Sequence, residues 1–340
     1  MKKRALALLI ALCLCVLTGC SAQASLQKYQ MTWFDLFDTV TMMTGYAESQ
    51  EAFAEQSEAF HDWMLWYHML YDIYNDYGGL INLKTVNDHA GEAVKVGPEI
   101  IELLKLAKEI ASASAGKTDV TLGSMLHVWH NAREAGLNDP EHAALPDMDE
   151  LEAAMAHTGI DLLEIDETAG TVRLTDPEAR LDVGALAKGF AVQQVCDKMP
   201  SGYMVSVGGN VCVTGPKPDG ALWTVGVQDP DGTGSDYLHI VCVSKGAVVT
   251  SGDYQRYYVA DGKRLHHLID PETRMPGDRW RSVTVICDDS GIADALSTSL
   301  FLSDLETGKA LLKQFDAVAS WVAADGTVSF SDGYEGYIKK

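Results

Sequence analysis

Residues 162–176 read LLEIDETAGTVRLTD, and they mark the point where strand-like patterns replace helical ones. Apolar and polar residues alternate on both sides of a turn that contains Gly170, which is typical of a β-hairpin. One helix, predicted at about 185–199, and eight short β-branched or aromatic segments follow. Because strands without helices between them favour antiparallel pairing over a doubly wound Rossmann fold, we predict an α+β protein with largely antiparallel sheets and packed helices. The eight segments are 203–207, 211–214, 222–228, 237–243, 247–250, 256–260, 264–269 and 282–287.

Helical patterns flank this region on both sides. The elements predicted before it are a strand at 34–44 and helices at 50–76, 98–116 and 149–159, the last of them capped by Asp149. Those predicted after it are helices at 291–302 and 304–314 and a hairpin at 318–330. The long helix carries an aromatic stripe, which more often packs in a core than binds a cofactor. Its members are Phe53, Phe60, Trp63, Tyr67, Leu70 and Tyr74.

The first twenty residues, MKKRALALLIALCLCVLTGC, combine a basic start with a short apolar run and are typical of an export signal. The run is too short for a stable membrane span. It ends in small residues before Cys20, which resembles the bacterial lipobox, where the cysteine receives diacylglycerol and becomes the new N-terminus. An ordinary cleaved signal is the alternative. We predict a signal peptide at 1–19, a lipidated tether at 20–30 and one domain at 31–340, either undivided or as two intimately packed halves, helix-rich to about 160 and strand-rich after it.

The formal charge of the 340 residues is −22, and it becomes −25 when the three basic residues of the signal are removed. Such acidity repels phosphate backbones and anionic lipids, so we expect no nucleic-acid partner and a membrane attachment that depends on the lipid. Four cysteines follow Cys20, an even number that allows disulfides in an exported protein. Cys212 and Cys242 lie between valines in strand-like runs, however, where a buried thiol behaves as a small apolar side chain. We therefore favour core packing over bridges.

A first polar motif, LDVGALAKG at residues 181–189, turns from a strand end into a helix. Exposed amides at such a helix start suit a phosphate, and Lys188 adds a positive charge. The spacing is not that of a Walker motif. A strand-to-helix turn with Asp182 as a cap is equally a common structural device, so this motif alone leaves its role open. The paired glycines in Gly208-Gly209-Asn210 likewise either admit a ligand or simply form a turn.

Residues 250–276, TSGDYQRYYVADGKRLHHLIDPETRMP, concentrate polar side chains on neighbouring predicted strands. Consecutive histidines in a strand point to opposite faces, so only one of His266 and His267 can line a given site. A histidine near a carboxylate is the usual general base, although most single histidines are structural. The polar side chains of this stretch include Ser251, Asp253, Arg256, His266, His267 and Asp270.

A predicted helix carries the motif DALST, in which Asp294 and Thr298 are four residues apart. This spacing places the carboxylate and the hydroxyl on one face of the helix, one turn apart, where they can share a hard cation. The alternative is a hydrogen bond between the two side chains or a capping role for Asp294. Oxygen ligands without a thiolate point to Mg²⁺ or Ca²⁺ rather than Zn²⁺.

In this order, the motifs LDxGxxAKG, GGN, TSGDYxRYY, HHxIDP and DALST resemble the ApbE family of flavin transferases over residues 34–330. The resemblance implies the T-fold-like architecture of that family. It implies a Mg²⁺ ion held by Asp294, Thr298 and a backbone oxygen of Ala185. It also implies His267 as the general base, with His266 the more replaceable of the two. The FAD contacts that it implies come from Tyr74, which we place at the end of the long helix, and from Lys117, Thr118, Asp119, Asp182, Lys188 and Leu268.

Two elements depart from the family's pattern. Phe37-Asp38-Thr39 stands where the family has an MGT-type element, so Phe37 would replace a methionine as an apolar or stacking group. Thr118-Asp119 stands where the family has Phe-Asp, which removes another aromatic side chain.

The resemblance implies a Mg²⁺-dependent FAD:protein FMN transferase. Such an enzyme cleaves FAD at its pyrophosphate, attaches FMN to a threonine of an exported flavoprotein, such as a subunit of a membrane redox complex, and releases AMP. With water as the acceptor, the same site would be an FAD pyrophosphatase. The sequence is also compatible with a non-catalytic flavin-binding lipoprotein and with a metal- or solute-binding lipoprotein of an uptake system, the second of which the clustering of the motifs disfavours. The lipobox predicts anchoring to the cell membrane, facing the extracytoplasmic side.

Overall fold

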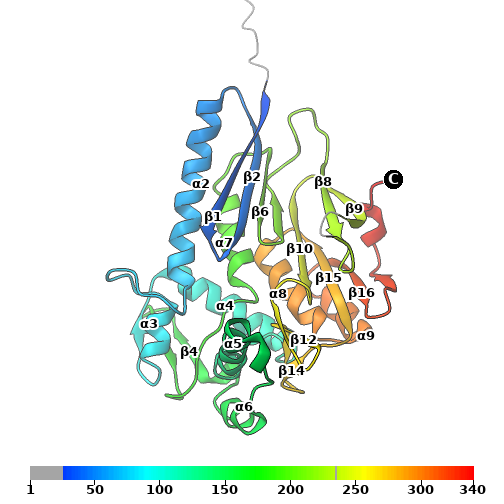
Figure 1. Cartoon of the computed structure of the whole chain (residues 1–340). Coiled ribbons are helices and arrows are strands. Elements are labelled where there is room, and N and C mark those ends of the chain that lie inside the picture. The colour runs from blue at the N-terminus through cyan, green and yellow to red at the C-terminus, as the bar shows by residue number, and fades with distance from the viewer. Residues whose placement is uncertain (1–25, 234–235) are drawn as a thin grey trace, which may run out of the picture.

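The computed structural model describes residues 26–233 and 236–340 (Figure 1). The predicted signal peptide at 1–19, Cys20 and most of the predicted tether lie outside the described residues. The end of that tether is described and differs from the prediction, because strand β1 already begins at Gln27 and pairs with β2 from there. No helix in the described ranges is long and apolar enough to cross a membrane.

A sheet of eight strands forms the centre of the fold, and each pair of neighbouring strands is antiparallel. Its order is β1-β2-β6-β7-β10-β15-β16-β17, with β1 and β17 at the two ends. The predicted α+β class with largely antiparallel sheets is thereby confirmed. The strands are β1 (Gln27–Leu36), β2 (Thr39–Ala47), β6 (Tyr203–Val207), β7 (Asn210–Val213), β10 (Gly246–Gly252), β15 (Trp280–Cys287), β16 (Val318–Ala323) and β17 (Val328–Phe330).

Smaller sheets lie outside the central one. The hairpin predicted at 162–176 is confirmed as β4 and β5, which pair on either side of a turn containing Gly170 and extend to a third strand, β3. The other small sheets are the antiparallel pairs β8/β9, β11/β12 and β13/β14. The strands are β3 (Val94–Lys95), β4 (Leu163–Asp166), β5 (Thr171–Leu174), β8 (Trp223–Gln228), β9 (Tyr237–Val243), β11 (Tyr257–Ala260), β12 (Lys263–His266), β13 (Ile269–Asp270) and β14 (Met275–Pro276).

Helices pack against the central sheet and against one another. The long helix α2 runs along β1 and β2, whereas α7 contacts β7 and α8 contacts β10 and β15 (Figure 1). The helices α7 and α8 also contact each other. The helices are α2 (Gln50–Tyr71), α3 (Leu83–Asp88), α4 (Pro98–Ala113), α5 (Gly123–Asn138), α6 (Met148–Met155), α7 (Ala187–Cys196), α8 (Ser290–Phe301) and α9 (Leu305–Leu312).

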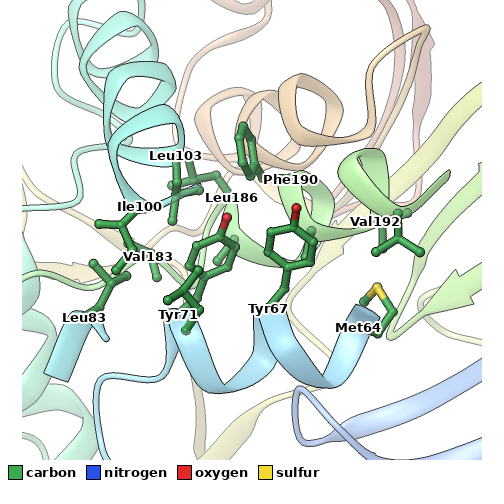
Figure 2. Packing of buried hydrophobic residues seen from close by; sticks show 14 of the residues in the cluster. Met64, Tyr67, Tyr71, Leu83, Ile100, Leu103, Val183, Leu186, Phe190 and Val192 are labelled. Carbon is green, nitrogen blue, oxygen red and sulfur yellow. The ribbon is translucent and has the colours of Figure 1, made fainter. Parts of the chain in front are cut away.

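A buried apolar cluster holds the start of α7 in place (Figure 2). Tyr67 and Tyr71 of α2 project toward α7, where the ring of Phe190 lies edge-on to Tyr71 at 6.3 Å between centroids. Ile100 and Leu103 of α4 close the cluster from another side. Full burial of an aliphatic or aromatic side chain contributes about 1.5–3 kcal/mol, so this packing fixes the helix whose N-terminus carries the LDVGALAKG motif.

The strand predicted at 34–44 is interrupted. Leu36 pairs with Thr39, so a two-residue turn at Phe37 and Asp38 divides the segment between the end of β1 and the start of β2. The turn residues Phe37 and Asp38 have φ values of 52° and 50°. Such turns usually contain asparagine, aspartate or glycine at the first position and glycine at the second, so a phenylalanine leaves no turn signal in the sequence.

The long helix is shorter than predicted. It ends at Tyr71, with Asp72 as its C-cap. The Asp72 carboxylate then accepts hydrogen bonds from the backbone N–H groups of Tyr74 and Asn75 at 2.6 and 3.1 Å. Tyr74 therefore lies in a turn beyond the helix, and the turn rather than the helix fixes its position.

The helix predicted at 149–159 also needs correction. The cap of α6 is Asp147, whose carboxylate accepts the N–H of Asp149, and the helix ends at Met155. The helices α3 and α5 were not predicted at all.

Among the cysteines, Cys212 packs in the core as predicted, whereas Cys242 is half-buried.

Candidate active site

The turn into α7 lies against the segment 117–121. The backbone N–H of Asp182 donates to Val120 O at 2.7 Å. The Asp182 carboxylate accepts the N–H of Gly184 at 2.8 Å, which shapes the turn. Two segments that are about sixty residues apart in the sequence therefore meet at Asp182. Burial in this turn raises the pKa of the half-buried Asp182 carboxyl above its ordinary value.

Helices α7 and α8 meet at Gly189. The N–H of Gly189 donates to Asp294 Oδ2 at 2.8 Å, and Lys188 Nζ lies 3.3 Å from the same oxygen. A Cβ atom at position 189 would collide with Ser290 O and with the Asp294 side chain, so this approach requires glycine. Asp294 is buried, and no hydrogen-bond donor reaches its other oxygen, Oδ1, among the residues that the structure describes.

Thr298 lies one turn after Asp294 on α8, as predicted from the spacing. Its Oγ1 is 3.5 Å from the hydroxyl oxygen of Ser251, which in turn is 2.7 Å from that of Ser297. The TSGDY motif, which begins at the end of β10, and the DALST motif on α8 are thus side by side. Ala185 lies in the turn just before α7.

Within the described ranges, no three residues of the types His, Cys, Asp or Glu form a group that could hold a metal. The predicted Mg²⁺ set contains one residue of these types, Asp294, together with a hydroxyl and a backbone oxygen. Its donors are all hard oxygen atoms, and Asp294 Oδ1 is free to act as a ligand. The residues present therefore fit a magnesium ion.

His266 belongs to the core. The residue is 6% exposed, its Nε2 lies 2.8 Å from Gly277 O, and its ring meets the ring of Phe301 edge to face with 5.5 Å between centroids. Strand β12 ends at this residue, so the predicted strand at 264–269 is interrupted before β13.

His267 has different surroundings from its neighbour. Its backbone N–H donates to Arg256 O at 3.1 Å, and its Nδ1 lies 3.3 Å from the same oxygen. With Nδ1–H directed at a carbonyl, Nε2 keeps its lone pair. The residue is open to solvent yet closely surrounded by protein, and this surrounding, with the positive charges of Arg256 and Lys188 nearby, lowers the pKa of His267. The ring is therefore neutral at pH 7 and able to accept a proton.

Lys117 and Leu268 lie close to the IDP sequence. Lys117 Nζ forms ion pairs with Asp270 Oδ1 at 2.9 Å and with Glu272 Oε1 at 3.0 Å. The side chain of Leu268 is buried in the core, and its N–H and carbonyl are both hydrogen-bonded within the chain. Leu268 therefore offers no free polar group, and Lys117 is already neutralised.

Thr118 and Asp119 also have partners within the protein. The Thr118 hydroxyl lies 2.7 Å from that of Ser299 on α8 and is buried. Asp119 Oδ1 accepts the N–H of Thr121 at 2.8 Å and so closes a local turn. These contacts attach the segment to α8 and shape its backbone.

Three aromatic rings form a row beside Asp182. Tyr74 is half exposed and stacks on His130, with 5.0 Å between centroids, and His130 stacks on His127 at 6.3 Å. Burial, with the negative charge of Asp182 nearby, raises the pKa of Tyr74 to about 12. The structure thus places Tyr74 near Asp182. The two histidines were missed because α5 was not predicted; their i, i+3 spacing just after residue 121 was the available signal.

The Phe37-Asp38-Thr39 element lies against the GGN turn at residues 208–210. A Cβ on Gly208, whose φ is 54°, would lie 2.5 Å from Thr39 Oγ1. The neighbouring Phe37 instead packs on α2, where its N–H donates to His68 Nδ1 at 3.0 Å and its ring contacts the His68 ring at 5.4 Å.

Comparisons with known proteins identify relatives of this chain. The model of the ApbE family matches residues 31–321. The FAD:protein FMN transferase of Treponema pallidum is 33% identical over 273 residues, which cover 74% of this chain and 73% of that protein. The FAD:protein FMN transferase of Vibrio cholerae is 32% identical over 261 residues, 75% of each chain.

Solved structures show the same fold. The ApbE protein from Thermotoga maritima superposes with a TM-score of 0.82 at 29% identity, covering 92% of this chain and all of that one. The flavin transferase ApbE from Vibrio cholerae superposes with a TM-score of 0.77 at 24% identity, covering 92% of this chain and 99% of that one. The family match, the relatives above 30% identity and the shared architecture lead to one conclusion: the chain belongs to the ApbE family.

Proposed function

We propose that this chain is an FAD:protein FMN transferase that cleaves FAD at its pyrophosphate and transfers FMN to a threonine. The observation that carries the proposal is the environment of Asp294. One of its oxygens is bound by Gly189 and Lys188 at the start of α7, the other is free, and Thr298 lies one turn away. The names of the relatives from Treponema pallidum and Vibrio cholerae support the same activity.

Asp294, Thr298 and the backbone oxygen of Ala185 would hold Mg²⁺, which would neutralise the pyrophosphate and stabilise the leaving AMP. Lys188 lies beside this site and adds a second positive charge toward the phosphates. Tyr74 and Asp182 would contact FAD at the other end of the site.

His267 supplies the base for the transfer. Its neutral Nε2 accepts the proton of the acceptor threonine hydroxyl as the oxygen attacks the phosphorus of the FMN half. A phosphorus–oxygen bond to threonine forms while the bond to the AMP phosphate oxygen breaks, and AMP leaves with that electron pair. The products are a phosphoester-linked flavoprotein and AMP.

Two other functions use the same residues. Attack by water would give free FMN and AMP, and binding without chemistry would leave FAD intact. Incubation of the domain with FAD, Mg²⁺ and candidate exported flavoproteins separates the three, with AMP measured by chromatography and the acceptor by mass spectrometry. We expect Mg²⁺-dependent AMP in equal amount to FMN-labelled acceptor, and no label on an acceptor whose threonine is replaced by valine. Stable FAD would contradict the proposal, and so would AMP and FMN without label.

We further propose that Cys20 carries a lipid that anchors the protein to the extracytoplasmic face of the cell membrane, where exported flavoproteins are the acceptors. The lipobox-like sequence before Cys20 supports this. Only a thiol forms the thioether to diacylglycerol, so Cys20→Ser is expected to leave the protein unlipidated. In a detergent phase separation the wild-type protein should enter the detergent and the variant the water. A variant that still enters the detergent phase would overturn the lipid assignment.

A further inference from the structure

The basic side chains of the site differ in whether a carboxylate lies beside them. Lys117 pairs with Asp270 at 2.9 Å, and Lys188 lies 3.3 Å from Asp294. Arg256, in contrast, has no carboxylate within 4 Å of its guanidinium among the residues that the structure describes, and it is exposed. In a chain with a formal charge of −22, an arginine without an acidic partner at the active site is a feature that needs an explanation.

The backbone at Arg256 is fixed from two directions. His267 donates its N–H to Arg256 O, which joins the arginine directly to the proposed base. Three residues earlier, Asp253 accepts a hydrogen bond from Arg281 Nε at 2.7 Å, which ties the loop between β10 and β11 to β15. The positive charge of Arg256 acts on both His267 and Asp182, so the arginine is close enough to both parts of the site to influence them.

We propose that Arg256 is a phosphate-binding residue that contacts the pyrophosphate of FAD beside His267 and stabilises the charge on its oxygens during transfer. The substrate in this inference rests on the proposed function. A guanidinium presents a planar fork that binds two phosphate oxygens at once, which an ammonium group does not. The charge of Arg180, which also lacks a carboxylate within 4 Å among the described residues, is felt instead at Tyr74 and His127, at the other end of the site.

The experiment compares ligands with and without phosphate. The affinities of FAD and riboflavin are measured by flavin fluorescence for the wild type, Arg256→Gln, Arg256→Lys and Arg173→Gln. The control, Arg173, is an exposed arginine of β5 whose guanidinium lies 3.6 Å from Glu164 on the small sheet. We expect Arg256→Gln to weaken FAD binding by about ten- to a hundredfold, the usual range for a hydrogen bond to a charged group, and riboflavin binding by less than about twofold.

The rate provides a second measurement. At saturating FAD, AMP release by Arg256→Gln should fall by about a hundredfold, which is typical for one lost donor to a transition-state charge. Arg256→Lys should recover part of the affinity but little of the rate, and Arg173→Gln should match the wild type. Unchanged FAD binding in Arg256→Gln, or an equal loss for riboflavin, would overturn the inference. Because the binding measurements need no turnover, a chain that binds FAD through Arg256 but transfers nothing would refute the proposed function alone.

Discussion

Replacement of Asp294 by asparagine is expected to lower FMN transfer at saturating FAD by about a hundredfold or more. The reason is that Asp294 is the one formal negative charge among the proposed Mg²⁺ ligands, and a metal that loses it supplies several kcal/mol less stabilisation to the transition state. Transfer is measured as AMP release, and Mg²⁺ affinity by calorimetry on the same samples. Both should fall together.

Asparagine is preferable to alanine because the carboxylate also accepts the N–H of Gly189. Alanine would leave that buried donor without a partner, which costs about 1–3 kcal/mol of stability and would confuse a folding defect with a metal defect. The matched control is Asp289→Asn, which keeps the cap at the start of the same helix. Near-normal Mg²⁺-dependent AMP release by Asp294→Asn would show that the metal is bound elsewhere.

The second large effect separates the two neighbouring histidines. His267→Ala should lower transfer by about 10²–10⁴-fold, the usual contribution of a general base, with FAD and Mg²⁺ binding retained. His266→Ala should change turnover far less. It removes the hydrogen bond to Gly277 O and the contact with Phe301, so its effect should instead be a loss of about 1–3 kcal/mol in the free energy of unfolding.

A single-turnover assay and a denaturant titration on both variants provide the measurement. The pH profile adds an independent criterion. Because the pKa of His267 is lowered, the acid limb of kcat/KM for FAD should lie below the ordinary histidine value of about 6.5 in the wild type and be absent in His267→Ala. Equal losses of turnover, or a larger one for His266→Ala, would show that the base has been assigned to the wrong ring.

The fold class and most of the strands follow from the sequence because their signals are local. The segment 203–207 coincides with β6, and the hairpin at 162–176 coincides with β4 and β5. The turn at Phe37-Asp38 was missed because its backbone conformation is imposed by pairing across β1 and β2 and by the packing of Phe37 on His68. Tertiary contacts of this kind leave no periodicity to detect.

The site, too, combines features that are local in the sequence with features that depend on the folded chain. The i, i+4 relation of Asp294 and Thr298 is a property of one helix and could be predicted. The two histidines were predicted to face opposite sides of one strand, and they do have opposite environments, but the strand ends between them. The stacking of Tyr74 on His130 joins a turn to a helix 56 residues later, and only the folded chain brings these rings together.

The contact at Gly189 bears on the thermodynamics of ligand binding. Because a backbone N–H already holds the Asp294 carboxylate and the two helices touch with no room for a side chain, the rotamer of that carboxylate is selected when the chain folds. A mobile carboxylate would lose side-chain entropy when it binds a metal. Here that entropy is already lost on folding. A cation or a nucleotide that binds at Asp294 would meet a site whose geometry is already set, so more of its intrinsic interaction energy would remain as affinity and as transition-state stabilisation.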